Sequence, residues 1–149
     1  MKVYKSWLPF SDPSGIRLRE WMGVTEDEFY DLTRIAIVPM AFCFPGYDSK
    51  GSDLPPPPIC AKTWREPVMG YLSHLQLTLA VGSAAIRWHL GPGKVSDVVS
   101  NWRQYLEAGV IPLPHPSWRN TAWLKRNPWF ESELLPVLRH KVRENLEAK

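Results

Sequence analysis

Three short apolar runs, separated by stretches with helical patterning, most constrain the fold of this chain. The runs cover residues 34–41, 77–81 and 110–113, and each has the length of a buried strand. Strands that alternate with helices are typical of a parallel sheet covered by helices on both faces. We therefore predict an α/β fold, a three-layer α/β/α sandwich around a short parallel sheet.

Start and stop signals place the helices between these runs. Gly23 ends a helix over residues 16–22, and Thr25-Glu26-Asp27-Glu28 is a capping box that opens the next one. Further helices are predicted over residues 60–75, with Pro67 as a kink, over residues 82–89, over residues 96–106, and from Asn127-Pro128 onward. The last helix has an apolar stripe made of Leu134, Leu135, Leu138, Val142 and Leu146, and we expect this stripe to pack on the sheet.

The size and composition of the chain agree with a compact globular protein. Its 149 residues fit one domain, 1–149, with a core of its own. The formal charge of +3 and the pI near 9.0 permit nucleic-acid binding without requiring it. No apolar run has the length of a membrane span, and two cysteines do not form a disulfide framework. We expect a monomeric cytoplasmic protein that does not bind membranes.

The third apolar run leads directly into a polar turn that contains one histidine. Residues 110–113 are followed by Pro114-His115-Pro116-Ser117-Trp118-Arg119-Asn120. The two prolines fix their own φ angles and push the preceding residues into extended geometry. The imidazole is thus presented from a stiff loop at the carboxyl end of a strand, where open α/β sheets bind ligands. The polar residues that follow suit phosphate or sugar contacts, so this turn is typical of a functional site.

The His-Pro-Ser turn resembles a signature motif of the uracil-DNA glycosylase superfamily, and three more segments match in family order. Pro9-Phe10 and the helix-like residues 12–21 resemble its Pro-Phe segment and first helix, residues 35–45 its second strand and Cys-x-Pro corner, and residues 77–85 its strand-Gly-small-helix unit. The resemblance spans residues 4 to about 145. It implies a hydrolase of DNA base-excision repair that cleaves the N-glycosidic bond of uracil or a related damaged base in DNA, at the nucleoid.

The resemblance also implies a role for each residue of the candidate site. His115 is the catalytic residue, which donates a hydrogen bond to the departing base, and Phe10, beside Pro9, stacks on the base. Ser117 and Asn120 contact the substrate. The DNA-binding loop consists of Ser117, Trp118, Arg119 and Asn120. Two alternatives stay open: Phe10 as a core aromatic, and Trp118 as an anchor of its loop instead of a wedge in the DNA.

Other aromatic, cationic and imidazole side chains have weaker assignments. Tyr4 and Trp7 are candidate neighbours of the stacking ring, and Trp123, Lys125 and Arg126 extend the expected DNA footprint. The other histidines are read as structural: His74, His89 and His140. No group of histidines, cysteines and carboxylates has the spacing of a zinc site.

Two departures from the family pattern leave the function open. Many relatives read uracil with an asparagine near the end of the second strand, whereas Val38-Pro39-Met40 has no amide side chain. The first strand and its water-positioning motif are also missing, so we expect an amino-terminally shortened member, less stable and less active than a longer form. The alternatives are a catalytically impaired DNA- or nucleotide-binding module of the same fold and an α/β protein that serves only as an interaction partner.

The two cysteines flank a proline-rich loop, residues 44–59. Cys43 and Cys60 lie where one branch of the superfamily has two of its four iron–sulfur ligands. Because such clusters are held by four thiolates, we expect no cofactor in this chain and a 4Fe-4S cluster in a longer form that carries an upstream Cys-x-x-Cys. The alternative is a pair of small buried thiols.

Overall fold

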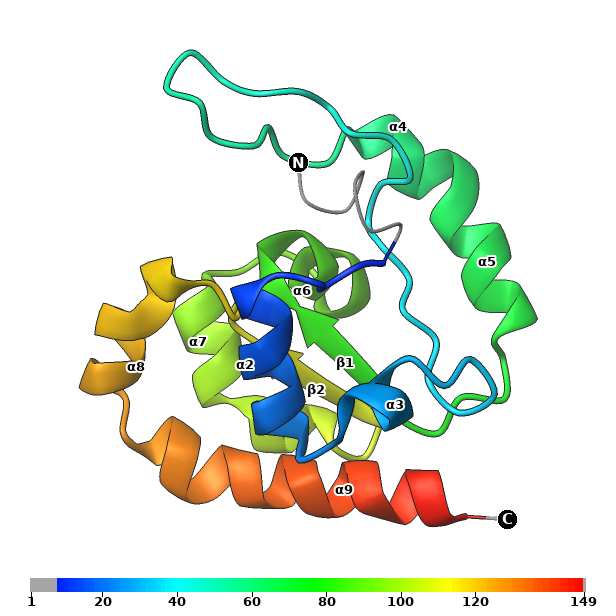
Figure 1. Ribbon diagram of the computed structural model, residues 1–149, viewed down its shortest axis with the longest axis vertical. Coiled ribbons are helices and arrows are strands. Elements are labelled where there is room, and N and C mark those ends of the chain that lie inside the picture. The colour runs from blue at the N-terminus through cyan, green and yellow to red at the C-terminus, as the bar shows by residue number, and fades with distance from the viewer. Residues whose placement is uncertain (1–7, 149) are drawn as a thin grey trace. The chain divides into compact units, whose positions relative to one another are not determined.

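The computed structural model describes residues 8–148, which divide into two compact units (Figure 1). Unit 1 combines Met1–Ile37 with Gln76–Lys149, and unit 2 is Val38–Leu75. The expectation of a single domain stays a prediction. No helix among the described residues combines the length and the apolar character that crossing a bilayer requires.

Unit 1 contains a short parallel sheet, which confirms the second and third predicted strands. Strand β1 (Thr78–Val81) pairs with β2 (Val110–Leu113) from Thr78↔Val110 to Val81↔Leu113. Gly109 precedes β2 with φ 68°, and a Cβ there would lie 2.6 Å from the carbonyl oxygen of Gln76. Only glycine therefore lets β2 begin so close to β1.

Helices connect the two strands as in a βαβ unit. Helix α6 (Gly82–Leu90) follows β1 directly, and α7 (Val95–Ser100) and a 3-10 turn, η2 (Trp102–Tyr105), lead to β2. The predicted helix over residues 96–106 is therefore wrong in two respects. It starts at Val95 without a side-chain cap, and it breaks near Asn101. The break buries Trp102 completely among the core residues, so packing outweighs local helix propensity here.

The remaining helices of unit 1 agree with the prediction only in part, because the first one begins at Pro13 instead of residue 16 and the helix over Thr121–Arg126 is not predicted. Helix α2 (Pro13–Met22) is capped by Asp12, whose side chain accepts a hydrogen bond from the Gly15 N–H, and it ends at Gly23 with φ 67°. In α3 (Glu26–Phe29) the Thr25 and Glu28 side chains cap each other's backbone N–H groups. The chain continues through η3 (Trp118–Asn120), α8 (Thr121–Arg126), the π-helical η4 (Phe130–Leu134) and α9 (Leu135–Glu147).

The core of unit 1 forms where α9 packs against α2, and α9 runs across the lower part of the view in Figure 1. The predicted apolar stripe of the last helix is confirmed, because all five of its residues are buried, whereas its packing on the sheet stays a prediction. Phe130 and Trp21 meet edge to face at 4.9 Å between ring centroids. Burial of such large side chains contributes about 1.5–3 kcal/mol each, so these contacts join α2 to the C-terminal helical segment.

The first predicted strand, over residues 34–41, is not a strand in the structure. The segment pairs with no other strand of the described chain. Instead, the carbonyl oxygens of Val38 and Pro39 accept hydrogen bonds from the Arg65 guanidinium at 3.1 and 3.2 Å. The apolar run predicts a buried strand, but none of these residues is buried, and a strand also needs a neighbour to satisfy its backbone groups. The observed sheet is the two-stranded one, and the three-layer sandwich stays a prediction.

Unit 2 consists of a long loop and a helical segment. An antiparallel bridge between Tyr47 and Asp53 closes a turn in which the Asp48 carboxylate accepts from the Lys50 and Ser52 N–H groups, both at 2.8 Å. The helical part runs through α4 (Pro58–Cys60), the π-helical η1 (Ala61–Arg65) and α5 (Glu66–Tyr71). Pro67 lies in the first turn of α5, just after the π-helical stretch, which accommodates its missing N–H.

Candidate functional site

His115 lies where the sequence predicts, in the loop at the carboxyl end of β2. Pro114 and Pro116 on either side are buried, whereas His115 is exposed. The loop closes on itself, because the Asn120 side-chain amide donates to the His115 carbonyl oxygen at 2.7 Å. Gly82, the first residue of α6, lies against the imidazole, since a Cβ there would be 3.6 Å from His115 Cδ2. The ends of both strands therefore meet at this histidine.

The surroundings of His115 favour its neutral form. Although its surface is partly open to solvent, neighbouring protein atoms desolvate the ring and lower the pKa of His115 below its usual 6.5, and the nearby Asp12 charge opposes this shift. The ring forms no hydrogen bond with any residue that the structure describes. A neutral imidazole has one N–H donor and one acceptor nitrogen. His115 can thus donate a hydrogen bond to a bound group at neutral pH.

Phe10 lies beside His115, although the two residues are far apart in the sequence. Their ring centroids are 6.3 Å apart and the planes are inclined by 30°. Phe10 is half-buried, and its φ of 57° is the one positive value among the non-glycine residues that the structure describes. Such backbone strain costs on the order of 1–3 kcal/mol and is found mainly at functional sites. The two residues form the walls of the candidate site.

The Phe10 wall is fixed by contacts to its backbone. The Tyr30 hydroxyl donates to the carbonyl oxygen of Pro9 at 2.9 Å, and the Arg19 guanidinium donates to that of Phe10 at 3.4 Å. The first turn of α2 approaches so closely that a Cβ at Gly15 would lie 1.6 Å from the Phe10 carbonyl oxygen. Phe10 therefore moves as one piece with α2.

The loop after His115 carries both internal contacts and exposed side chains. The carbonyl oxygen of Ser117 accepts from Arg17, and the Asn120 amide is used within the loop. Trp118 is 76% exposed, and Arg119 is exposed as well. A side chain this exposed makes few packing contacts, and the two roles of Trp118, wedge and loop anchor, both stay predictions. Trp118 and Arg119 are thus the residues of the loop that are available to a partner.

The cationic side chains of α8 lie at its end, and its tryptophan packs inward. Lys125 and Arg126 are exposed. The Trp123 indole donates to the Ser96 hydroxyl at 2.7 Å and its ring lies edge to face with Phe130 at 5.8 Å. Trp123 therefore ties α8 to α7.

Sequence reasoning missed two polar residues next to the site. Asp12 is close enough to His115 for its charge to act on the pKa of the imidazole, and Arg17 donates to the loop at Ser117 and Thr121. The helix-cap pattern Ser11-Asp12-Pro13 identifies Asp12 as a cap, but not as a neighbour of His115. No sequence signal links Arg17 to a loop a hundred residues away.

The described residues bring together no ligand set for an iron–sulfur cluster or another multi-ligand metal centre, and the expected cluster in a longer form stays a prediction. Cys43 is exposed and Cys60 half-buried, both in unit 2, and neither is in a disulfide. Over residues 8–148, no three histidines, cysteines or carboxylates lie close enough to share an ion. The chain offers two of the four thiolates that a cluster needs. Tyr4 and Trp7 fall outside the described residues.

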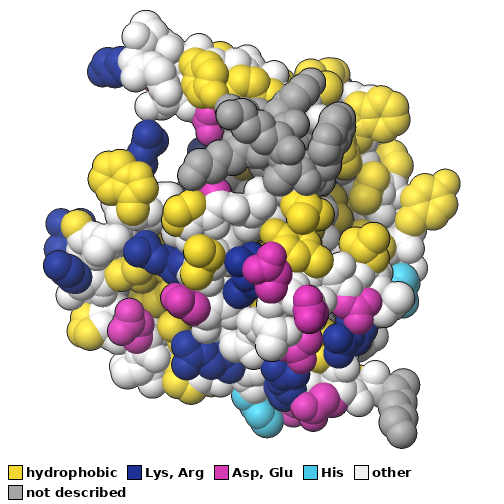
Figure 2. All heavy atoms as spheres, viewed as in Figure 1, with side chains coloured by type: hydrophobic (Ala, Val, Ile, Leu, Met, Phe, Trp, Pro, Cys, Tyr) yellow, Lys and Arg dark blue, Asp and Glu magenta, His cyan; other side chains and the backbone are white. Residues whose placement is uncertain are grey.

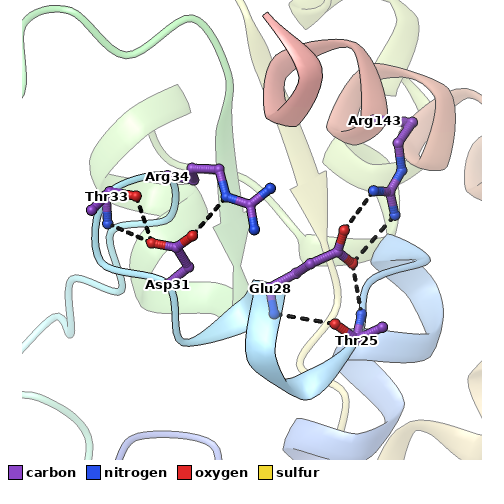
Figure 3. Close-up of polar contacts among 6 residues, drawn as sticks. All are labelled: Thr25, Glu28, Asp31, Thr33, Arg34 and Arg143. Carbon is purple, nitrogen blue, oxygen red and sulfur yellow. Dashed lines mark hydrogen bonds and ion pairs between the residues drawn. The ribbon is translucent and has the colours of Figure 1, made fainter. Parts of the chain in front are cut away.

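A second polar cluster, around α3, is fully paired (Figure 3). Glu28 accepts from Arg143 at 2.6 Å and from the Thr25 N–H at 2.9 Å, contacts that lower the pKa of Glu28 to about 2. Hydrogen bonds from Thr33 and Arg34 likewise lower the pKa of Asp31 to about 2. Basic and acidic side chains intermingle in the lower part of the view in Figure 2. This cluster joins α3 to α9 and has no charge left for a ligand.

The comparison with protein families agrees with this geometry. The model of the Uracil DNA glycosylase superfamily matches residues 3–139, most of the chain. The match includes the Phe10 segment, both strands and the His115 loop, and it implies the α/β fold of that family. The resemblance carried by the sequence motifs is therefore confirmed, and this chain belongs to the uracil-DNA glycosylase superfamily.

Proposed function

We propose that this chain is a DNA glycosylase of base-excision repair that hydrolyses the N-glycosidic bond of uracil or a related damaged base. The observation that carries the proposal is the pair of facing rings, Phe10 and His115, at 6.3 Å between centroids. One ring offers an apolar face for a base, and the other offers a hydrogen-bond donor at the end of a strand. The superfamily to which the chain belongs acts on DNA bases.

The reaction needs a donor aimed at the departing base. When the bond between C1′ of the sugar and the base nitrogen breaks, the electron pair moves to the base and the sugar becomes cationic. Neutral His115 donates a hydrogen bond to the base oxygen on which this negative charge develops. A fixed donor of this kind stabilises a transition state by about 3–4 kcal/mol. The stiff proline-flanked loop supports this role because it fixes the ring before the base arrives.

Asp12 supports the second half of the reaction. Its carboxylate lies near His115 at the first turn of α2, and one oxygen is engaged with the Gly15 N–H at 3.3 Å. A carboxylate here stabilises the cationic sugar and accepts a proton from the water whose oxygen bonds to C1′. The products are the free base and an abasic site.

The loop after His115 provides access to a base within a duplex. A base in a duplex must be flipped out of the stack at a cost of a few kcal/mol. The exposed Trp118 is suited to fill the gap that the base leaves, and Arg119, Lys125 and Arg126 are suited to phosphate contacts. Stacking of the flipped base on Phe10 contributes about 1–3 kcal/mol.

One observation favours a second candidate function, a module that binds DNA or a nucleotide without turnover. The segment Val38-Pro39-Met40 supplies no side-chain amide to read a base. A site without such an amide binds several bases weakly instead of one base tightly, because hydrogen bonds to a base edge provide discrimination.

An assay of base release separates the two candidates. The parent chain and Asp12→Asn are incubated with single- and double-stranded oligonucleotides that contain uracil, hypoxanthine or no damaged base. Asparagine still caps α2 but lacks the charge, so we expect abasic sites from the parent and at least a tenfold lower rate from the variant. DNA binding by the parent without release of any base contradicts the glycosylase and supports the binding module.

A further inference from the structure

We propose that Arg17 is a positioning residue that sets the separation of the two walls of the base site, Phe10 and His115. The proposal rests on the proposed function of this site and assigns a role to a residue that has none in that function. Arg17 lies on α2, and its side chain is half-buried.

The first wall belongs to the same rigid piece as Arg17. Phe10 precedes α2 by three residues, and the Gly15 backbone packs directly on its carbonyl group. Arg17 is on the next turn of the same helix. A shift of α2 therefore carries Phe10 with it.

The second wall belongs to the loop that Arg17 holds. The Arg17 Nη1 donates to the carbonyl oxygen of Ser117 at 3.1 Å, and both Nη atoms lie 3.4 Å from the Thr121 Oγ1. Ser117 and Thr121 flank the short helix η3, whose Asn120 binds the His115 carbonyl oxygen. Arg17 thus forms hydrogen bonds at both ends of η3. Asn120 in η3 in turn donates a hydrogen bond to the main chain of His115.

The chemistry of the side chain suits this task. A guanidinium presents several N–H donors in a fixed planar fork, so it can bond two acceptors at once, whereas a lysine ammonium is a flexible point donor. A donor misplaced by about 1 Å can cost on the order of a hundredfold in rate. Loss of the Arg17 hydrogen bonds is therefore expected to lower the rate of the chemical step more than the affinity for DNA.

The kinetic test compares two arginines of the same region. In Arg17→Ala we expect kcat for base release to fall about ten- to a hundredfold while KM for the oligonucleotide changes less than threefold. Arg17→Lys restores part of kcat, and Thr121→Val loses less than Arg17→Ala because the Ser117 carbonyl remains. The matched control, Arg119→Ala, removes an exposed cation and is expected to raise KM with little change in kcat. An unchanged kcat in Arg17→Ala overturns the proposal.

A spectroscopic test distinguishes failure of this inference from failure of the proposed function. The chain has four histidines, so ring proton–carbon spectra resolve each imidazole, and His115→Ala identifies the signal of His115. In Arg17→Ala we expect this signal to move and its pKa to rise toward the ordinary value, because the ring leaves its desolvated position. If the parent releases no base, the proposed function fails, yet the displaced signal still supports the positioning role. An unmoved His115 signal overturns that role whatever the rates are.

Discussion

The cluster around Glu28 and the loop around His115 use hydrogen bonds in opposite ways. At Glu28, side chains bond to one another and to the backbone, and the carboxylate accepts from Arg143 and from the Thr25 N–H (Figure 3). In the His115 loop, Arg17 and Asn120 bond to main-chain carbonyl groups, whereas the imidazole and the Trp118 indole are left open. Charged side chains that pair with one another stabilise the fold. A loop whose backbone is fixed by hydrogen bonds, and whose side chains remain accessible, can bind a partner.

This contrast separates the fully paired cluster around Glu28 from the candidate site at His115 without reference to any relative. Both regions contain charged and aromatic residues, and both connect distant parts of unit 1. What differs is the group that receives the hydrogen bonds. Four substitutions test this difference, from the largest expected effect to the smallest.

Removal of the His115 imidazole is expected to have the largest effect on base release. We expect His115→Ala to slow base release by about 10²–10³-fold in single-turnover kinetics, because the departing base loses its donor. His140→Ala is the matched control, since His140 is exposed on α9 and pairs with Glu144 at 3.1 Å. Equal rates for the parent and His115→Ala would remove His115 from the mechanism.

Removal of the exposed indole separates base flipping from chemistry. We expect Trp118→Ala to slow release from a duplex about tenfold and from a single strand less than twofold, because only the duplex requires a base to be unstacked. The measurement is the ratio of the two single-turnover rates, with uracil at the same sequence position. A uniform loss on both substrates would instead assign Trp118 to the folding of its loop.

Arg119 tests whether the open side chains meet phosphate. The association constant for DNA is measured at several salt concentrations. In Arg119→Ala, the slope of its logarithm against the logarithm of the salt concentration should decrease in magnitude by about 0.9, since one phosphate contact is lost. Arg103→Ala serves as the control, because Arg103 already pairs with Glu133 at 2.5 Å. If both variants keep the parent slope, the loop does not contact the DNA backbone through Arg119.

Glu28→Gln tests the structural side of the comparison and should leave base release unchanged at pH 7. Because folding lowers the pKa of Glu28 from 4.5 to about 2, its carboxylate stabilises the fold above pH 4.5, and this contribution is lost as the pH falls from 4.5 toward 2. Urea unfolding at pH 7, 5 and 3 should therefore show the variant less stable at pH 7 and the difference shrinking at pH 3. Glu131→Gln, an exposed position on η4, should behave like the parent. A constant difference at all three pH values would contradict the assigned pairing.

The sequence predicted several helix caps and the parallel pair of strands, but it predicted one strand that does not form. The caps at Thr25 and Gly23 follow from side chains within a few residues, and the structure has both. Residues 34–41 have the composition of a strand, but a strand depends on a partner elsewhere in the chain, and Arg65 binds the Val38 and Pro39 carbonyl groups instead. The residue pattern of one segment does not show which other segment will pair with it.

The candidate site shows the same limit. The position of His115 in a loop at the carboxyl end of β2 could be predicted, because the two prolines constrain it locally. Its nearness to Phe10 followed only from the family resemblance, and Asp12 and Arg17 required the packing of α2 against the loop. The two missed residues, Asp12 and Arg17, interact with a loop that is distant in the sequence. The spacing of residues along the chain does not predict such contacts.

The way Phe10 is held has a consequence for engineering base selectivity. Its anchors, the Tyr30 hydroxyl and the Arg19 guanidinium, bind main-chain carbonyl groups, so the ring can be exchanged without disturbing the scaffold beneath it. A saturation library at position 10 would thus vary the surface offered to the base while the site stays assembled. Since the backbone there has φ 57°, valine, isoleucine and threonine should drop out of such a library, and asparagine, histidine and flat aromatic side chains should survive.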